Sequence, residues 1–182
     1  MITRKYSFGG QVATKQIHSE WAAGTYPSLI QKTDFHYNIR GWLTAINDPE
    51  NTAAKNDIFA MKLHYSDAMT GLSAPLQYNG NISSVNWATN HDGVKSAYAY
   101  NYDDLDRLTS GAYYQGNANG YSHDGSFDEK DLAYDANGNL TTLHRYGAGT
   151  KLAKIVKDGD ALPADSLIYC SNFVYDLNGS LQ

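Results

Sequence analysis

A short pattern that returns several times along the chain limits what it can fold into. The pattern is a tyrosine, an Asp or Asn, two variable residues, a glycine, one variable residue and then a branched aliphatic residue. Complete copies occupy residues 37–43, 134–140 and 175–181; residues 102–108 carry Asp106 at the glycine position, residues 6–12 are a degenerate copy, and residues 78–82 are a copy two residues shorter. A repeated local unit favours an array of stacked elements over a single catalytic centre.

The residue type at each position of the pattern predicts a β-hairpin. Asp or Asn suits the first position of a type I turn, because its side chain can bond the backbone two residues on. The glycine falls where the chain needs a positive φ, which completes a three-residue loop with a bulge. With residues 136–138 as this loop, Tyr134 faces Leu140 directly across the strands, a pair worth about 0.2–1 kcal/mol. Asp106 is one of the few other residue types that tolerates the left-handed conformation.

We therefore expect the important residues to hold the register of the hairpins and to do no chemistry. They are the turn residues and facing pairs Tyr37, Gly41, Leu43, Tyr102, Asp106, Leu108, Tyr134, Asp135, Gly138, Leu140, Tyr175, Gly179 and Leu181. The shorter copy leaves its register open, since Asn79-Gly80 could instead close a two-residue type I′ turn.

Strands are expected on both sides of each turn. Residues 97–102 alternate strictly with tyrosines on one face, residues 58–65 alternate with their large apolar side chains on one face, and residues 167–175 have strand composition. Leu43 and Ile46 are three positions apart, which places them on opposite faces of a sheet unless a bulge intervenes. The predicted fold is all-β, with consecutive antiparallel hairpins in a curved, shell-like sheet that runs through residues 1–182 as one array.

The composition supports this fold and excludes several classes of function. The chain has 182 residues, including 15 tyrosines and 16 glycines but only 4 prolines, and a formal net charge of −5. The absence of a basic cluster argues against nucleic-acid binding. No stretch approaches the roughly 20 apolar residues of a membrane span, and the first residues lack the apolar run of a signal peptide. Cys170 stands alone and gives no indication of the compartment.

The repeated Tyr-Asp-x-x-Gly-x-Leu pattern resembles the YD repeat of the Rhs family, whose relatives include the shell component of bacterial insecticidal toxin complexes and the teneurins. The likeness extends from Tyr6 to Leu181, and residues 37–44, 59–63 and 78–82 look like the version common in gut Bacteroidetes. The resemblance implies hairpins that spiral into a hollow shell, which encloses a toxic domain or presents an adhesion surface. It also implies an exported or cell-surface parent protein, of which this chain is a fragment, with toxin cargo or a surface glycan as partner.

No catalytic, cofactor or metal site is predicted. The histidines are scattered, and turn chemistry accounts for Asp103, Asp104 and Asp106. The acidic loop at residues 124–131 lacks the full spacing of a helix-loop-helix calcium site.

The sequence leaves two further expectations, which concern self-association and an alternative function in ligand binding. The unpaired strand edges of an open array predict self-association. The alternative function is a carbohydrate- or protein-binding module that uses exposed aromatic residues, for which the candidates are Trp21, Trp42, Trp87, Tyr113 and Tyr114.

Overall fold

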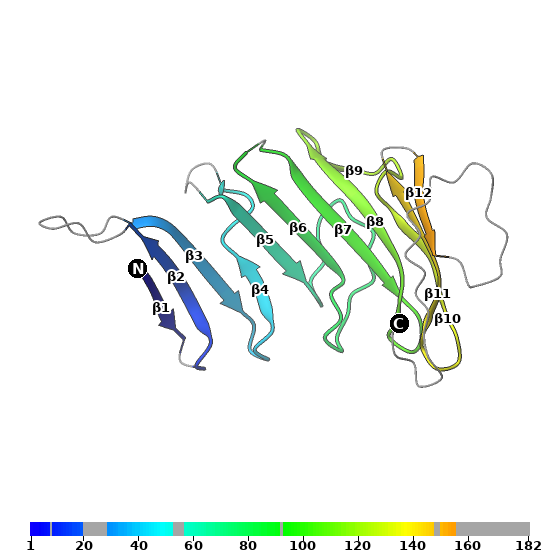
Figure 1. Cartoon of the computed structure of the whole chain (residues 1–182), viewed down its shortest axis with the longest axis horizontal. Helices are drawn as coiled ribbons and strands as arrows, with labels where there is room; N and C mark the ends of the chain where they lie inside the picture. Colours follow the sequence, from blue (N-terminus) through cyan, green and yellow to red (C-terminus); the bar gives the residue numbers. More distant parts are fainter. Residues whose placement is uncertain (8, 20–28, 53–56, 92, 148–149, 156–182) are drawn as a thin grey trace, which may run out of the picture.

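The protein folds as a long antiparallel sheet (Figure 1). The computed structural model describes residues 1–7, 9–19, 29–52, 57–91, 93–147 and 150–155. The strands are β1 (Ile2–Tyr6), β2 (Val12–His18), β3 (Leu29–Tyr37), β4 (Leu43–Ile46), β5 (Phe59–His64), β6 (Ser84–Thr89), β7 (Lys95–Tyr102), β8 (Leu108–Asn117), β9 (Gly120–Ser122), β10 (Glu129–Tyr134), β11 (Leu140–Gly147) and β12 (Thr150–Ile155).

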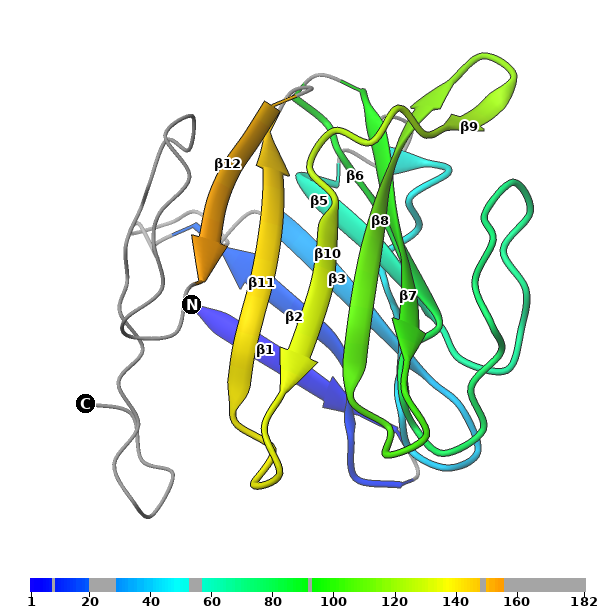
Figure 2. The ribbon, with the colours of Figure 1, turned by 90° about the vertical axis from the view of Figure 1, so that its right-hand side faces the viewer.

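Each strand pairs with the next one along the chain, except that β9 folds back on the end of β8 and β10 then pairs with β8. All of these pairings are antiparallel, so the predicted all-β fold of consecutive hairpins is confirmed. The predicted strands at residues 58–65 and 97–102 correspond to β5 and β7. The one expected at residues 167–175 lies outside the described part of the chain. The sheet twists and curls along its length, and its ends turn toward the same side (Figure 2).

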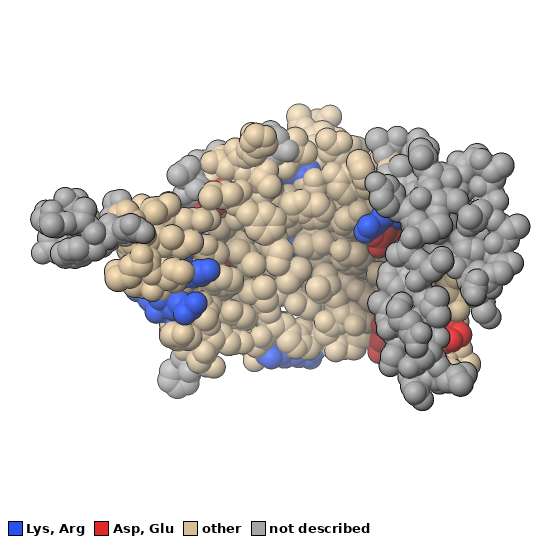
Figure 3. Space-filling view, viewed as in Figure 1, with Lys and Arg blue, Asp and Glu red and all other residues tan. Residues whose placement is uncertain are grey.

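The two faces of the curved sheet differ in the size of their side chains. The registers place Met61 opposite Trp87 and Val85 opposite Tyr98, and Tyr98 in turn lies opposite Tyr113. We call this concave side the aromatic face; its residues on β5–β8 are Phe59, Met61, Leu63, Val85, Trp87, Tyr98, Tyr100 and Tyr113. Over these strands it displays few charged side chains (Figure 3).

The opposite, convex side carries small residues, and it is the better buried of the two. Ala60, Ala88, Ala97 and Ala99 are at most 1% exposed, because the chain segments between the strands fold over them. Phe59 on the aromatic face is 38% exposed. The fully buried side chains of the described residues are small or polar, so this part of the sheet has no core of large apolar residues on either side.

In the described part of the chain, a bulge follows the aliphatic residue of the motifs at 6–12, 37–43, 102–108 and 134–140, and it decides on which face the next apolar residue lies. Tyr37 faces Leu43, but the next residue back, His36, faces Ala45, so Thr44 has no partner in the register. The extra residue places Leu43 and Ile46 on the same face, whereas their offset of three alone would separate them. The apolar residues that follow a turn therefore add to one face of the sheet and do not cover both faces.

Candidate functional site

The candidate site is the set of repeated turns and the contacts that join one hairpin to the next. In the turn at residues 135–139, the amide of Gly138 donates to the carbonyl of Asp135 at 3.1 Å, and the amide of Asp135 donates to the carbonyl of Asn139 at 3.0 Å. The turns that begin at Ser7, Asn38 and Asp103 form the same two bonds at 2.7–3.0 Å. The predicted three-residue loop with a bulge is therefore present in all four of these turns.

The Asp or Asn side chain fixes each complete turn from inside. Asp135 Oδ1 accepts the amides of Asn137 and Asn139 at 2.9 and 2.8 Å, and Asp103 Oδ1 accepts those of Leu105 and Arg107 at 3.0 and 2.9 Å. Asn38 Oδ1 does the same in the turn at residues 38–42. One oxygen atom satisfies two backbone donors that the turn would otherwise leave to solvent, which explains why the motif needs Asp or Asn at this position.

The residue at the glycine position has a positive φ in every one of these turns. The φ angles are +77° for Gly10, +79° for Gly41, +84° for Gly138 and +63° for Asp106. The expected left-handed conformation of Asp106 is confirmed. Its carboxylate accepts a hydrogen bond from Asn79 Nδ2 at 2.6 Å. This bond helps to offset the conformational free energy by which Asp is less favourable than glycine at positive φ.

The facing pairs are those that the spacing predicted. Tyr37 lies opposite Leu43, Tyr102 opposite Leu108, and Tyr134 opposite Leu140. In the degenerate first copy, Tyr6 lies opposite Val12.

The contact that sequence reasoning missed is made by the tyrosine hydroxyl groups. Tyr37 donates its hydroxyl to the carbonyl oxygen of Val12 at 3.1 Å, and Val12 is the aliphatic residue of the preceding motif. Tyr102 donates likewise to Ile82, and Tyr134 to Leu108, each at 2.8 Å. Each hairpin is thus bonded to the one before it at the bulged end, where the regular ladder of the sheet is interrupted. We call this series of bonds the hydroxyl ladder.

The remaining member of the hydroxyl ladder corrects the reading of residues 78–82. The hydroxyl that bonds the carbonyl of Leu43, at 2.8 Å, belongs to Tyr65 and not to Tyr78. Tyr78 is 65% exposed, and Asn79 has no positive φ, so this segment forms neither a motif pair nor a type I′ turn. Tyr65 is the last residue of the alternating run at residues 58–65 and directly follows β5. This position was the only signal in the sequence that Tyr65 is the tyrosine that joins the hairpins.

Burial keeps these phenols in their donating form. It raises the pKa of Tyr65 and Tyr134, and it raises that of Tyr102 although the bond to Ile82 acts in the opposite direction. In the turns, the hydrogen bond from Arg107 lowers the pKa of the Asp103 carboxyl, and the side chain of Asn139 lowers that of Asp135. These raised pKa values keep Tyr65, Tyr102 and Tyr134 protonated as donors, and the lowered pKa values keep Asp103 and Asp135 ionised as acceptors at neutral pH.

Among the described residues, the candidate aromatic residues for ligand binding, which are Trp42, Trp87, Tyr113 and Tyr114, do not share one surface. Trp87 and Tyr113 lie on the aromatic face with their ring centroids 6.3 Å apart, whereas Tyr114 lies on the other face and packs against His123 in a tilted arrangement with ring centroids 5.1 Å apart. Trp42 packs against Tyr65, and Trp21 lies outside the described residues. Tyr175, Gly179, Leu181 and Cys170 also lie outside the described residues.

The acidic loop at residues 124–131 is engaged with the protein itself. The side chain of Asp128 is fully buried; it accepts the amide of Tyr113 at 2.8 Å and pairs with His123 Nε2 and Lys130 Nζ, each at 2.9 Å. No group of three or more His, Cys, Asp or Glu residues that could hold a metal ion occurs in the described part of the chain.

Comparison with protein-family models and with curated proteins gave no match. Within the residues that the structure describes, no helix is both long and apolar enough to cross a membrane. The functional assignment therefore depends on the geometry of the hairpins.

Proposed function

We propose that this chain is a non-catalytic structural segment of an Rhs-type YD-repeat shell or cell-surface array. In this proposal it belongs to a longer, exported parent protein, where it encloses a toxic domain or forms a surface for cell contact. The turns and facing pairs hold the register, and no residue of the segment takes part in a reaction.

The observation that carries the proposal is the hydroxyl ladder. The same donor and the same acceptor recur at Val12, Leu43, Ile82 and Leu108, although the chain between the hairpins varies in length. A hydrogen bond that joins adjacent hairpins and tolerates insertions in the loops between them is suited to a repeat array that grows by adding hairpins in one direction. An enzyme would instead bring different side chains together at one cleft.

The aromatic face supports the enclosing role. It is concave, carries few charges over β4–β8, and leaves large apolar side chains such as Phe59 partly exposed (Figures 2 and 3). A contiguous apolar surface on a soluble protein marks a place where another surface is bound. In a closed wall this face would line the interior and contact the enclosed domain.

The test uses the parent protein expressed from its complete gene. Electron microscopy is expected to show hollow particles, and limited proteolysis is expected to leave the enclosed domain intact. Trp87→Asp places a charge on the aromatic face and should expose that domain to protease, whereas Tyr114→Asp on the opposite face should not. Particles without a lumen, or equal protection in both variants, would overturn the proposal.

A further inference from the structure

The convex side of the sheet has a polar cavity that the structural role does not use. It has a volume of about 390 Å³ and lies between the loop at residues 48–50, the loop at residues 68–70 and Tyr121 of β9. Its floor consists of side chains from β5 and β6, including His64 and Asn86. The volume falls within the range of about 300–1,000 Å³ typical of small-molecule sites.

A chain of hydrogen bonds crosses the floor of this cavity. Asp67 Oδ2 lies 2.6 Å from His64 Nδ1, His64 Nε2 lies 3.3 Å from Asn86 Oδ1, and Asn86 Nδ2 points to the hydroxyl of Tyr121 at 3.5 Å. His64 and Asn86 are 4% and 3% exposed, so their positions are fixed by the sheet. A primary amide has two donors and two acceptor lone pairs. Asn86 uses one of each in this chain, which orients the hydroxyl group of Tyr121 at the edge of the cavity.

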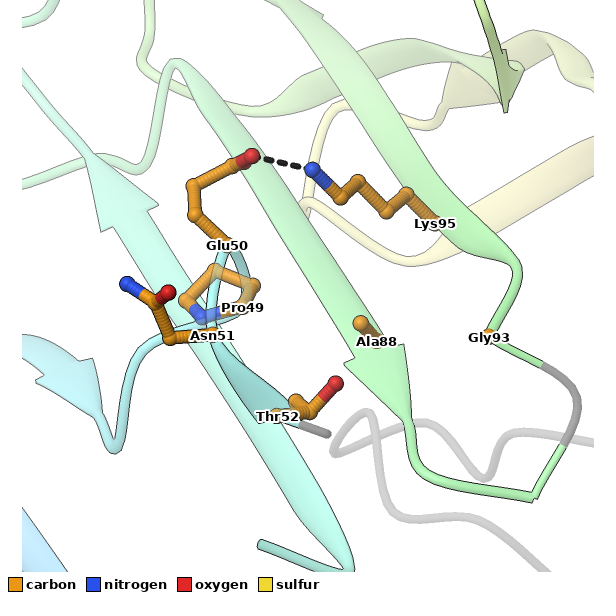
Figure 4. Close-up of a pocket in the computed structure, with 7 residues that line it drawn as sticks. All are labelled: Pro49, Glu50, Asn51, Thr52, Ala88, Gly93 and Lys95. Atoms are coloured by element: carbon orange, nitrogen blue, oxygen red, sulfur yellow. Dashed lines mark hydrogen bonds and ion pairs between the residues drawn. The ribbon is translucent and has the colours of Figure 1, made fainter. Parts of the chain in front are cut away.

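Charges of both signs surround the cavity. Asp48 and Glu50 contribute carboxylates and Lys62 contributes an ammonium group. Glu50 is also paired with Lys95, which belongs to an adjoining cavity of about 300 Å³ (Figure 4). A strongly anionic or cationic ligand would lie beside at least one group of its own sign of charge here, whereas a neutral ligand with many hydroxyl groups would find both donors and acceptors.

The cavity also offers apolar surface beside these polar groups. Met69 and Ala68 line one wall, and the ring of Tyr121, which is partly exposed, lines another. A tyrosine combines an apolar ring face with a polar hydroxyl at its edge. Sugar rings present the matching combination, with C–H groups on a face and hydroxyl groups around the rim.

We propose that this cavity binds one unit of a neutral saccharide. The Tyr121 ring packs against the C–H face of the sugar, and the exposed side chains of Lys62 and Thr70 form hydrogen bonds with its hydroxyl groups. The site lies on the face opposite to the aromatic one, so a wall segment could hold a saccharide on its outer side while its inner side contacts other protein.

The proposal is tested by applying the chain to an array of neutral and charged glycans, followed by calorimetry on each retained glycan. A neutral glycan is expected to bind. Tyr121→Ala should weaken binding about tenfold or more, which corresponds to the loss of one good contact. Tyr121→Phe should retain most of the affinity because it keeps the ring. Tyr78→Ala removes an exposed tyrosine outside the cavity and should leave the affinity within about twofold of the original.

Circular dichroism establishes whether each variant is folded, and Thr70→Ala on the exposed loop provides a second test if Tyr121→Ala is not. Retention of charged glycans alone, or of none, would overturn the proposal. So would a glycan whose affinity ignores both Tyr121→Ala and Thr70→Ala, or one lost through Trp87→Ser on the aromatic face. None of these outcomes bears on the hydroxyl ladder, so the saccharide site can fail while the structural role stands.

Discussion

Removal of a single hydroxyl group from the ladder gives the sharpest test of how the hairpins are joined. In Tyr134→Phe the ring stays in place and only the donor to the Leu108 carbonyl, at 2.8 Å, is lost. A protein hydrogen bond of this kind contributes about 0.5–1.5 kcal/mol net. The bond is partly buried, so we expect a loss of about 1 kcal/mol in the free energy of unfolding, or about 2–4 °C in Tm for a chain of this size.

The matched control is Tyr78→Phe, which makes the same chemical change on a ring that is 65% exposed. A surface change of this kind should stay within about 0.5 kcal/mol of the unmodified protein. Both variants are compared by urea denaturation, with the fluorescence of the three tryptophans and the far-ultraviolet circular dichroism as separate probes. If Tyr134→Phe unfolds at the same urea concentration as Tyr78→Phe, the ladder contributes nothing measurable and the reasoning fails.

Three further predictions concern the turns, the buried carboxylate and the sheet edge. Gly138→Val should destabilise the protein by about 1–2 kcal/mol, since φ is +84° there and space is not limiting, whereas the exposed Ala136→Val should not; equal urea midpoints would contradict this. Asp128 is buried, yet the bonds from Lys130, Tyr113 and His123 lower its pKa, so its stabilisation holds above about pH 4 and is lost as the pH falls through the lowered pKa. Asp128→Asn should therefore be less stable at pH 6 but flatter than the original between pH 5 and 2 in urea titrations, and parallel curves would argue against the pairing. The edge of β1, which no described strand pairs, should give a mass that rises with concentration in light scattering, and Ile2→Lys should reduce this rise; a monomer at every concentration would refute self-association.

The turns could be predicted because their cause is local. Asp or Asn at the start, a residue that tolerates positive φ, and an aliphatic residue two positions later lie within seven residues, so sequence spacing and spatial distance coincide. For this reason even Asp106, which departs from the pattern, could be assigned its conformation beforehand. The facing pair Tyr134 and Leu140 followed from the loop length alone.

The shorter copy shows where local reasoning ends. Residues 78–82 resemble a motif, yet the ring that joins this hairpin to its neighbour is Tyr65, which precedes a long loop. The spacing of the motif does not select Tyr65 over Tyr78, and the only signal in the sequence is that Tyr65 ends the alternating run at residues 58–65. The selection is made by β5 and β6, which pair from Phe59 with Thr89 to His64 with Ser84 and leave Tyr65 immediately after the last paired residue.

The sequence by itself determined that the chain reverses at regular chemical signals and builds an antiparallel sheet from these reversals. Only the tertiary structure decided that the tyrosine hydroxyls reach the preceding hairpin, that the large side chains share one concave face, and that His64, Asn86 and Tyr121 meet beneath a cavity on the other. The physical reason is distance along the chain. A turn depends on the torsions of a few adjacent residues, whereas these contacts join residues 20 or more positions apart, and their geometry depends on the bulges and curvature of the assembled sheet.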